Sequence, residues 1–144
     1  MGYEFRHSTD APVSRDFAWQ FWTNVENWVV VDPSVEWVNL DGTFASGARG
    51  TTKPQGFAQT GWMLSGVQEG RRAVIEVAVP GAVMRFLWVF EESAGGGTRI
   101  TQRVSLEGER AEDYLGGMKE FEEGIPAGMR SLAQAMVRAA NGAA

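Results

Sequence analysis

The last third of the chain constrains the fold more than any other segment, because its apolar residues repeat at helical spacing. The residues of this apolar face are Leu115, Met118, Phe121, Ile125, Met129, Leu132 and Met136. Their spacing predicts one long amphipathic helix from about Glu112 to Ala140, whose apolar face another layer must cover. Pro126 lacks a backbone N–H, so we expect a bend or break near residues 124–126. The final residues, 141–144, are expected to fray.

The chain before this helix is predicted to consist mainly of short strands. Residues 3–9 alternate between apolar and polar side chains, which places Tyr3, Phe5 and His7 on one face of a half-buried strand. Further strand candidates follow, separated by short glycine-rich or charged connections of the kind that join antiparallel strands. Pro54 falls inside one candidate, so we expect that strand at an edge of the sheet.

Two short helices are predicted directly after the first strand. Ser14 can cap the first of them, and Phe17, Phe21 and Val25 then recur at four-residue spacing. The predicted fold is therefore α+β, with a curved antiparallel sheet of about seven strands wrapped on the long C-terminal helix. We expect residues 1–144 to form a single domain, as the length suggests.

A sheet that wraps one helix leaves a space between the two layers, and large side chains mark its walls. Arg85 indicates the outer face of its strand, so the alternation places Met84, Phe86 and Trp88 inside. Gln102 is the single polar group in the inward row of the next strand, and a buried amide needs a partner from the protein or a ligand. The residues predicted to line the cavity and contact a ligand are Trp28, Met84, Phe86, Trp88, Gln102, Met118, Phe121, Ile125 and Met129. For each of them, plain core packing is the alternative.

The composition argues against several classes of function. The net charge of −5 and the pI of about 4.9 disfavour nucleic-acid partners and anionic membrane surfaces. The absence of cysteine rules out thiolate chemistry, and one histidine, His7, cannot form a two-histidine metal site, so we expect no metal and no cofactor. Neither a signal peptide nor an apolar run of membrane-spanning length is present, which predicts a cytoplasmic protein.

Several stretches occur in an order that is typical of one superfamily. They are the Ala11-Pro12-Val13 start of the first helix, the Trp22…Asn24…Trp28…Pro33 segment, VEWVNLDGTFASGARGT, the turn at residues 69–72, GGGTRITQRVSLEG and the closing helix. In this order the chain resembles the START/Bet v 1-like superfamily, also called SRPBCC, in its polyketide cyclase/dehydrase-like branch. It departs from the family at Asn24, where members often have Asp, and at Val30-Val31, where they often have a second Trp. The resemblance implies a helix-grip fold with an internal cavity for an apolar or aromatic small molecule, and no universal catalytic residues.

Three functions remain open from the sequence. The first is a protein that sequesters or carries an apolar small molecule, which Gln102, His7 or Tyr114 would orient. The second is a polyketide-type cyclase or dehydratase, in which the cavity would fold the substrate and His7 or Tyr114 would move protons. The third is a protein–protein interaction module, and the outer pair Leu87 and Val89 could also mark a homodimer interface. Few inward-facing titratable groups are predicted, which favours binding over catalysis.

Overall fold

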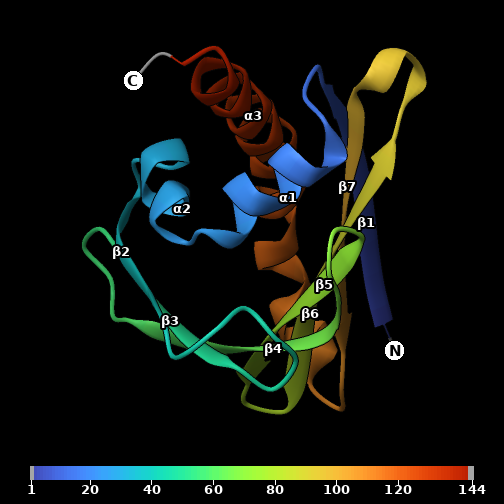
Figure 1. The fold of residues 1–144 in the computed structure, drawn as a ribbon. Coiled ribbons are helices and arrows are strands. Elements are labelled where there is room, and N and C mark those ends of the chain that lie inside the picture. The colour runs from blue at the N-terminus through green and yellow to red at the C-terminus, as the bar shows by residue number, and fades with distance from the viewer. Residues whose placement is uncertain (1, 143–144) are drawn as a thin grey trace.

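A curved antiparallel sheet wraps round one long helix in the computed structural model, which describes residues 2–142 (Figure 1). The strands are β1 (Gly2–Ala11), β2 (Val35–Leu40), β3 (Arg49–Pro54), β4 (Thr60–Gln68), β5 (Arg72–Val79), β6 (Ala82–Glu92) and β7 (Thr98–Glu107). The helices are α1 (Arg15–Thr23), α2 (Glu26–Val31) and α3 (Leu115–Ala140), with 3₁₀ turns at Ala94–Gly96 (η1) and Ala111–Tyr114 (η2). The predicted α+β helix-grip architecture is confirmed. The fraying predicted for residues 141–144 lies partly outside the described residues.

The seven strands form one sheet in the order β1-β7-β6-β5-β4-β3-β2. Every neighbouring pair from β2 to β7 is consecutive in sequence, which is the predicted meander, and β1 joins it by pairing with β7 along its whole length. The register shifts between Ser65 and Gln68 in β4 and between Val35 and Trp37 in β2. Such irregularities bend a strand and increase its twist, so they contribute to the curvature that surrounds the helix.

The prediction that Pro54 lies in an edge strand was wrong. Pro54 is the last residue of β3, which has β2 on one side and β4 on the other. The β3–β4 ladder already ends at the pair Thr52–Thr60, so no bond to β4 is lost where proline has no N–H. On its other side Pro54 pairs with Val35 of β2, which is the true edge strand.

Helix α3 is continuous across Pro126, so it does not break there, and the alternative prediction of a bend stays a prediction. Proline leaves the carbonyl of Glu122 without its helical partner, but Glu122 is exposed and water can take the place of the missing N–H. The apolar face of α3 packs against the sheet, with Met129 and Met136 at 1% and 0% exposure. This packing holds the helix together despite the proline.

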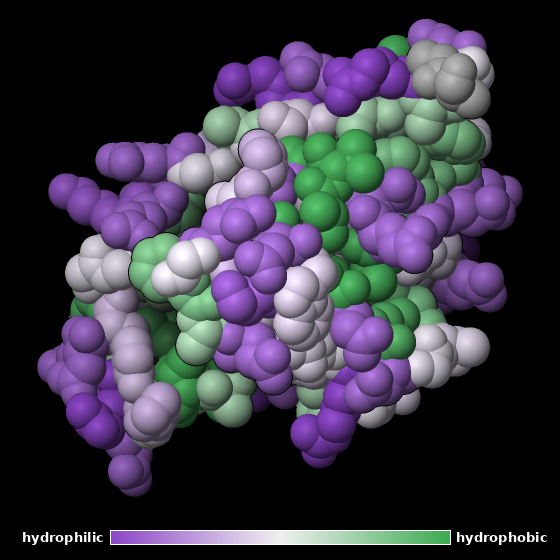
Figure 2. All heavy atoms as spheres, turned by 90° about the vertical axis from the view of Figure 1, so that its left-hand side faces the viewer, coloured by the Kyte–Doolittle hydropathy of each residue, from purple (hydrophilic) through white to green (hydrophobic). Residues whose placement is uncertain are grey.

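The two short helices close one end of the space between the sheet and α3 (Figure 1). The backbone N–H of Phe17 donates to the Ser14 side-chain oxygen at 3.2 Å, which confirms the predicted cap. Helix α1 buries Trp19 and Trp22 in the core, whereas α2 has no fully buried residue and leaves Val30 69% exposed. Figure 2 shows strongly hydrophobic atoms between hydrophilic side chains on the face that carries α2 and β2. Within residues 2–142, every helix is too short or too polar to span a bilayer.

The outer face of the sheet carries ion pairs beside the apolar pair Leu87 and Val89. Arg85 lies 3.2 Å from Glu107 and 3.8 Å from Glu76. Leu87 and Val89 are half-buried rather than fully exposed. Their role in a homodimer stays a prediction.

Candidate ligand-binding cavity

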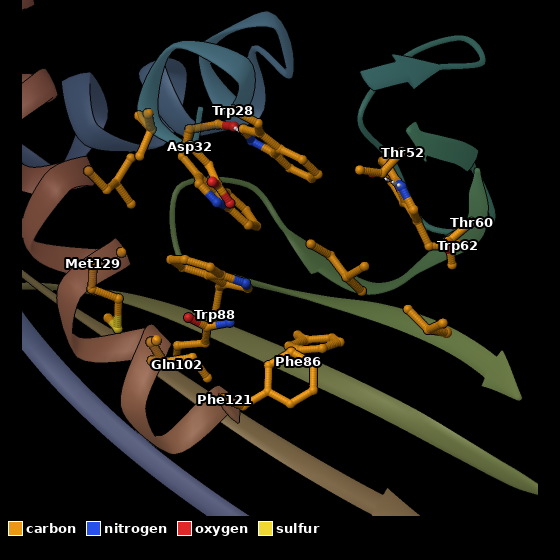
Figure 3. Close-up of a pocket in the computed structure, with 18 of the residues that line it drawn as sticks. Trp28, Asp32, Thr52, Thr60, Trp62, Phe86, Trp88, Gln102, Phe121 and Met129 are labelled. Atoms are coloured by element: carbon orange, nitrogen blue, oxygen red, sulfur yellow. Dashed lines mark hydrogen bonds between the residues drawn. The ribbon is translucent and has the colours of Figure 1, made fainter. Parts of the chain in front are cut away.

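A cavity of about 490 Å³ lies between the concave face of the sheet, α2 and α3 (Figure 3). This volume falls within the range of small-molecule binding sites in proteins. The cavity opens to solvent, and its walls come from both short helices, from β3 to β7 and from α3. Most of its lining is apolar and much of that is aromatic.

Four tryptophans form an arc along one wall of the cavity. The ring centroids of Trp88 and Trp22 are 5.0 Å apart, those of Trp22 and Trp28 are 6.0 Å apart, and those of Trp28 and Trp62 are 5.3 Å apart. Two hydrogen bonds fix the outer half of the arc. The Trp28 indole N–H donates to the Trp22 carbonyl at 2.7 Å, and the Trp62 indole N–H donates to the Thr52 hydroxyl at 2.9 Å. These hydrogen bonds hold the indole rings of Trp28 and Trp62 in place.

Trp62 can take its position because the residue opposite it on the neighbouring strand is a glycine. Gly50 lies directly opposite Trp62 in the β3–β4 ladder, and a Cβ at Gly50 would sit 2.2 Å from the indole ring. The ring therefore lies flat on the bare backbone of β3. Any larger residue at this position would push Trp62 away from the strand.

The opposite wall joins the sheet to α3. Phe86 of β6 and Phe121 of α3 meet edge to face, with ring centroids 5.5 Å apart and an interplanar angle of 66°. Ile125 and Met129 continue this wall along the helix, and both are buried.

Two glycines of α3 also line the cavity and leave part of the helix bare. A Cβ built on Gly124 or Gly128 would meet no atom within 4 Å, so nothing fills the space in front of them. Glycine in a helix interior is less favourable than alanine by about 0.8–1.0 kcal/mol. The two glycines, both exposed, thus lower the stability of the helix and leave its backbone uncovered where it lines the cavity.

The deepest polar group of the cavity is the side chain of Gln102, which is only 7% exposed. It lies directly opposite Trp88 across the β6–β7 ladder and opposite His7 across the β1–β7 ladder. No residue within 2–142 forms a hydrogen bond with its carboxamide. Figure 3 shows the carboxamide and the Trp88 indole on the cavity side of the sheet. A buried amide normally has a partner, and this one borders the cavity, where water or another molecule can pair with it.

The ionisable residues of the described cavity lining are two carboxylates, Asp32 and Glu120. Both residues are exposed, which places them at the solvent end of the cavity. Asp32 ends α2, and one of its carboxylate oxygens accepts hydrogen bonds from the Ser34 N–H at 3.0 Å and the Ser34 hydroxyl at 2.6 Å. Figure 3 shows the Asp32 carboxylate directed into the cavity.

Seven of the nine side chains predicted to contact a ligand lie on the cavity wall. They are Trp28, Phe86, Trp88, Gln102, Phe121, Ile125 and Met129. The other two, Met84 and Met118, belong to the hydrophobic core instead, where Met118 is 3% exposed and Met84 packs on buried neighbours. Alternation along a strand or helix identifies the inward face, but it does not tell at which level the sheet and helix separate. Whether the seven bind a ligand stays a prediction.

The two side chains considered as proton carriers do not line the cavity. His7 lies on the inner face of β1, half-buried, and the Tyr114 hydroxyl donates to the Pro80 carbonyl at 2.6 Å. Across the described residues, no three His, Asp or Glu side chains form a group that could hold a metal ion.

Among the cavity residues that sequence reasoning missed are Trp62, Asp32, Glu120 and the two glycines of α3. Trp62 alternates with Leu64 in the segment TGWMLSGV, which is a usable signal, but no charged residue marks the outer face of that strand. The sequence marks Asp32 only as the end of a helix and the two glycines only as residues that disfavour a helix, and neither signal indicates a cavity.

Solved structures resemble this one over nearly the whole chain, although no protein-family model and no curated protein sequence matches it. The crystal structure of Ara h 8.0201 has a TM-score of 0.72 at 10% identity and covers 95% of this chain and 99% of its own. Norcoclaurine synthase from Thalictrum flavum, in complex with dopamine and hydroxybenzaldehyde, has a TM-score of 0.75 at 9% identity and covers 96% and 88%. The di-domain ARO/CYC StfQ from the steffimycin biosynthetic pathway has a TM-score of 0.74 at 14% identity and covers 99% and 53%. At such identities the likeness concerns the fold alone, and the chain has the helix-grip fold of the START/Bet v 1-like (SRPBCC) superfamily.

Proposed function

We propose that this protein binds a hydrophobic, aromatic small molecule in the cavity between the sheet and α3. The observation that carries the proposal is an open space of about 490 Å³ walled by aromatic rings, with a buried amide that has no protein partner. Burial of apolar surface contributes about 25 cal/mol per Å², and each aromatic pair adds about 0.5–1.5 kcal/mol beyond its area. A flat ring system that packs on the tryptophan arc would gain both from burial of apolar surface and from aromatic pairing.

Polar contacts would set the orientation of this ligand. The Gln102 carboxamide can donate and accept, and the Trp88 indole can donate. A ligand carbonyl or hydroxyl next to them would satisfy the amide that the protein leaves unpaired. The norcoclaurine synthase structure supports the class of ligand, because it holds two aromatic molecules, dopamine and hydroxybenzaldehyde, on the same fold.

The proposal is tested by native mass spectrometry of the purified protein and by titration with the apolar fluorophore N-phenyl-1-naphthylamine. We expect a co-purifying small molecule or tight fluorophore binding, and Trp88→Ala should weaken the fluorophore about ten-fold or more without unfolding the domain. Trp37→Ala is the matched control, because Trp37 lies on β2, is 37% exposed and does not line the cavity. Equal fluorophore affinities of the wild type and Trp88→Ala would refute the assignment of the cavity.

A cyclase or dehydratase acting in the same cavity is the second candidate. Its support is the Asp32 carboxylate at the cavity mouth, together with the fold shared with StfQ. Against it, neither His7 nor Tyr114 reaches the cavity. An enzyme of this kind would convert a bound aromatic polyketide, and Asp32→Asn would abolish conversion while the substrate still bound.

A further inference from the structure

The charges around the cavity mouth point to the chemistry of the ligand. We propose that the cavity selects an aromatic amine, with the ring among the tryptophans and the protonated nitrogen at the exposed, acidic end of the cavity, which Asp32 and Glu120 line. This inference rests on the proposed function and narrows it. It names the charge of the ligand, which neither the fold nor the apolar walls determine.

The first argument is charge complementarity. Asp32 follows α2 and Glu120 lies on α3, so one carboxylate comes from each of two neighbouring elements that line the cavity. One carboxylate oxygen of Asp32 accepts both hydrogen bonds from Ser34, which leaves the other oxygen for a ligand. Within residues 2–142, Glu120 forms no ion pair. No lysine, arginine or histidine lines the described cavity. A ligand carboxylate would therefore meet two negative charges and no compensating positive charge.

The second argument is the position of the indole faces next to Asp32. The Asp32 backbone N–H donates to the Trp28 carbonyl at 3.0 Å, so the carboxylate and the indole lie one helical turn apart at the end of α2. The Trp28 ring is followed along the arc by the tilted ring of Trp62, with the two ring centroids 5.3 Å apart. A cation that sits over a tryptophan face is attracted by the ring itself. The Asp32 end of the cavity therefore has a carboxylate and an indole ring within one helical turn of each other.

The third argument is independent of the acidic residues. Gln102 is buried, unpartnered and directed into the same cavity from the centre of β7. The cavity thus has an inner polar group as well as an acidic mouth, with aromatic rings between them. This arrangement fits a ligand with a hydrogen-bonding group at one end, a ring system in the middle and an amine at the other end. Two solvated surface carboxylates alone would not define such a site.

The test uses three naphthalene compounds that differ only in the attached group: 2-(aminomethyl)naphthalene, 2-naphthalenemethanol and 2-naphthoate. Isothermal titration at pH 7 and low salt should give an affinity about ten-fold higher for the amine than for the alcohol, and the lowest affinity for the carboxylate. The amine-to-alcohol ratio should fall to about two-fold or less in the double variant Asp32→Asn/Glu120→Gln. It should fall in the same direction when salt is raised to 0.5 M, because mobile ions screen exposed charges.

The matched control removes two negative charges elsewhere. Glu109→Gln/Glu112→Gln lies at the start of the C-terminal segment, and both residues are exposed and outside the cavity lining. This variant should keep the ratio of the wild type, which separates a local effect from the effect of net charge.

The outcomes distinguish the inference from the proposed function. If none of the three compounds binds, or if Trp88→Ala weakens none of them, the proposed function itself fails. If all three bind alike, if the carboxylate binds best, or if the double variant keeps the ratio, the amine inference is overturned while the proposed function stands. If the double variant does not fold, the salt dependence of the wild-type ratio decides: a ratio that salt does not change refutes the inference.

Discussion

The bare stretch of α3 allows a prediction in which stability and binding change in opposite directions. Gly124 and Gly128 lie in the interior of the helix, neither has a positive φ, and a Cβ at either position meets no atom within 4 Å. Replacement of both by alanine should therefore stabilise the protein without a clash. At about 0.8–1.0 kcal/mol per site, the gain is about 2 kcal/mol. For a chain of this length that corresponds to a rise in Tm of roughly 5–8 °C.

The same positions should control the cavity. A leucine at Gly128 also favours the helix over glycine, but Gly128 lines the cavity, so we expect the new side chain to take up part of the 490 Å³ that the proposed ligand would occupy. We expect Gly128→Leu to raise Tm and to weaken N-phenyl-1-naphthylamine about ten-fold or more, since steric exclusion removes the apolar contacts of the ligand. Thermal unfolding followed by circular dichroism and the fluorophore titration are carried out on the same samples.

Gly116 and Gly117 provide the control on the same helix. Neither has an atom within 4 Å of a built Cβ, and neither lines the cavity. Gly116→Ala/Gly117→Ala should stabilise the protein and leave fluorophore affinity unchanged. A loss of stability in Gly124→Ala/Gly128→Ala would show that the space is not open, and full fluorophore affinity in Gly128→Leu would show that the ligand binds elsewhere. Either result would refute the reasoning.

Three further perturbations follow from individual contacts. Gly50→Ala places a methyl group against the Trp62 ring, so we expect a loss of about 1–3 kcal/mol in urea unfolding and weaker fluorophore binding. Gln102→Leu replaces an unpaired buried amide by an apolar side chain of similar size, so stability should stay the same or rise while a hydroxyl-bearing ligand such as 2-naphthol loses its advantage over 2-methylnaphthalene. Burial, the hydrogen bond to Glu122 and the negative charge of Glu122 raise the pKa of Tyr3 to about 12. The stability that this shift contributes is complete below the ordinary pKa of 10 and is lost as pH rises through 12, and Glu122→Gln should lower the Tyr3 pKa in a titration of absorbance at 295 nm.

The sequence correctly predicted which side chains of a strand or helix point inward, because this depends only on local periodicity. Alternation placed Phe86, Trp88 and Gln102 inside, and the three-to-four spacing placed Phe121 and Met129 on the inner side of the helix; all five line the cavity. Whether an inward side chain lines the cavity or packs in the core depends on how far the sheet curves away from the helix at that level. No local pattern encodes that distance, so two methionines of the core were grouped with the cavity wall.

Other differences arise because tertiary context decides what a local signal means. Pro54 is tolerated in an inner strand, since it sits where one of the two ladders has already ended. Trp62 faces the cavity because its ring fits against Gly50 on the adjacent strand. The pairing of residues 50 and 62 is known only once the register of the two strands is known. A prediction from one strand at a time does not contain this pairing.

The Gly124–Gly128 stretch of α3 shows how a local conflict in the sequence can coincide with the wall of a cavity. Glycine, proline and glycine at positions 124, 126 and 128 all disfavour a helix, and from the sequence they predict a bend or break. The helix persists because buried neighbours such as Ile125 and Met129 hold it against the sheet. The two glycines then present bare backbone to the cavity, where longer side chains would have filled it. Natural sequences tend to break local rules at functional sites, and the weakest part of the helical pattern borders the cavity for which we propose a function.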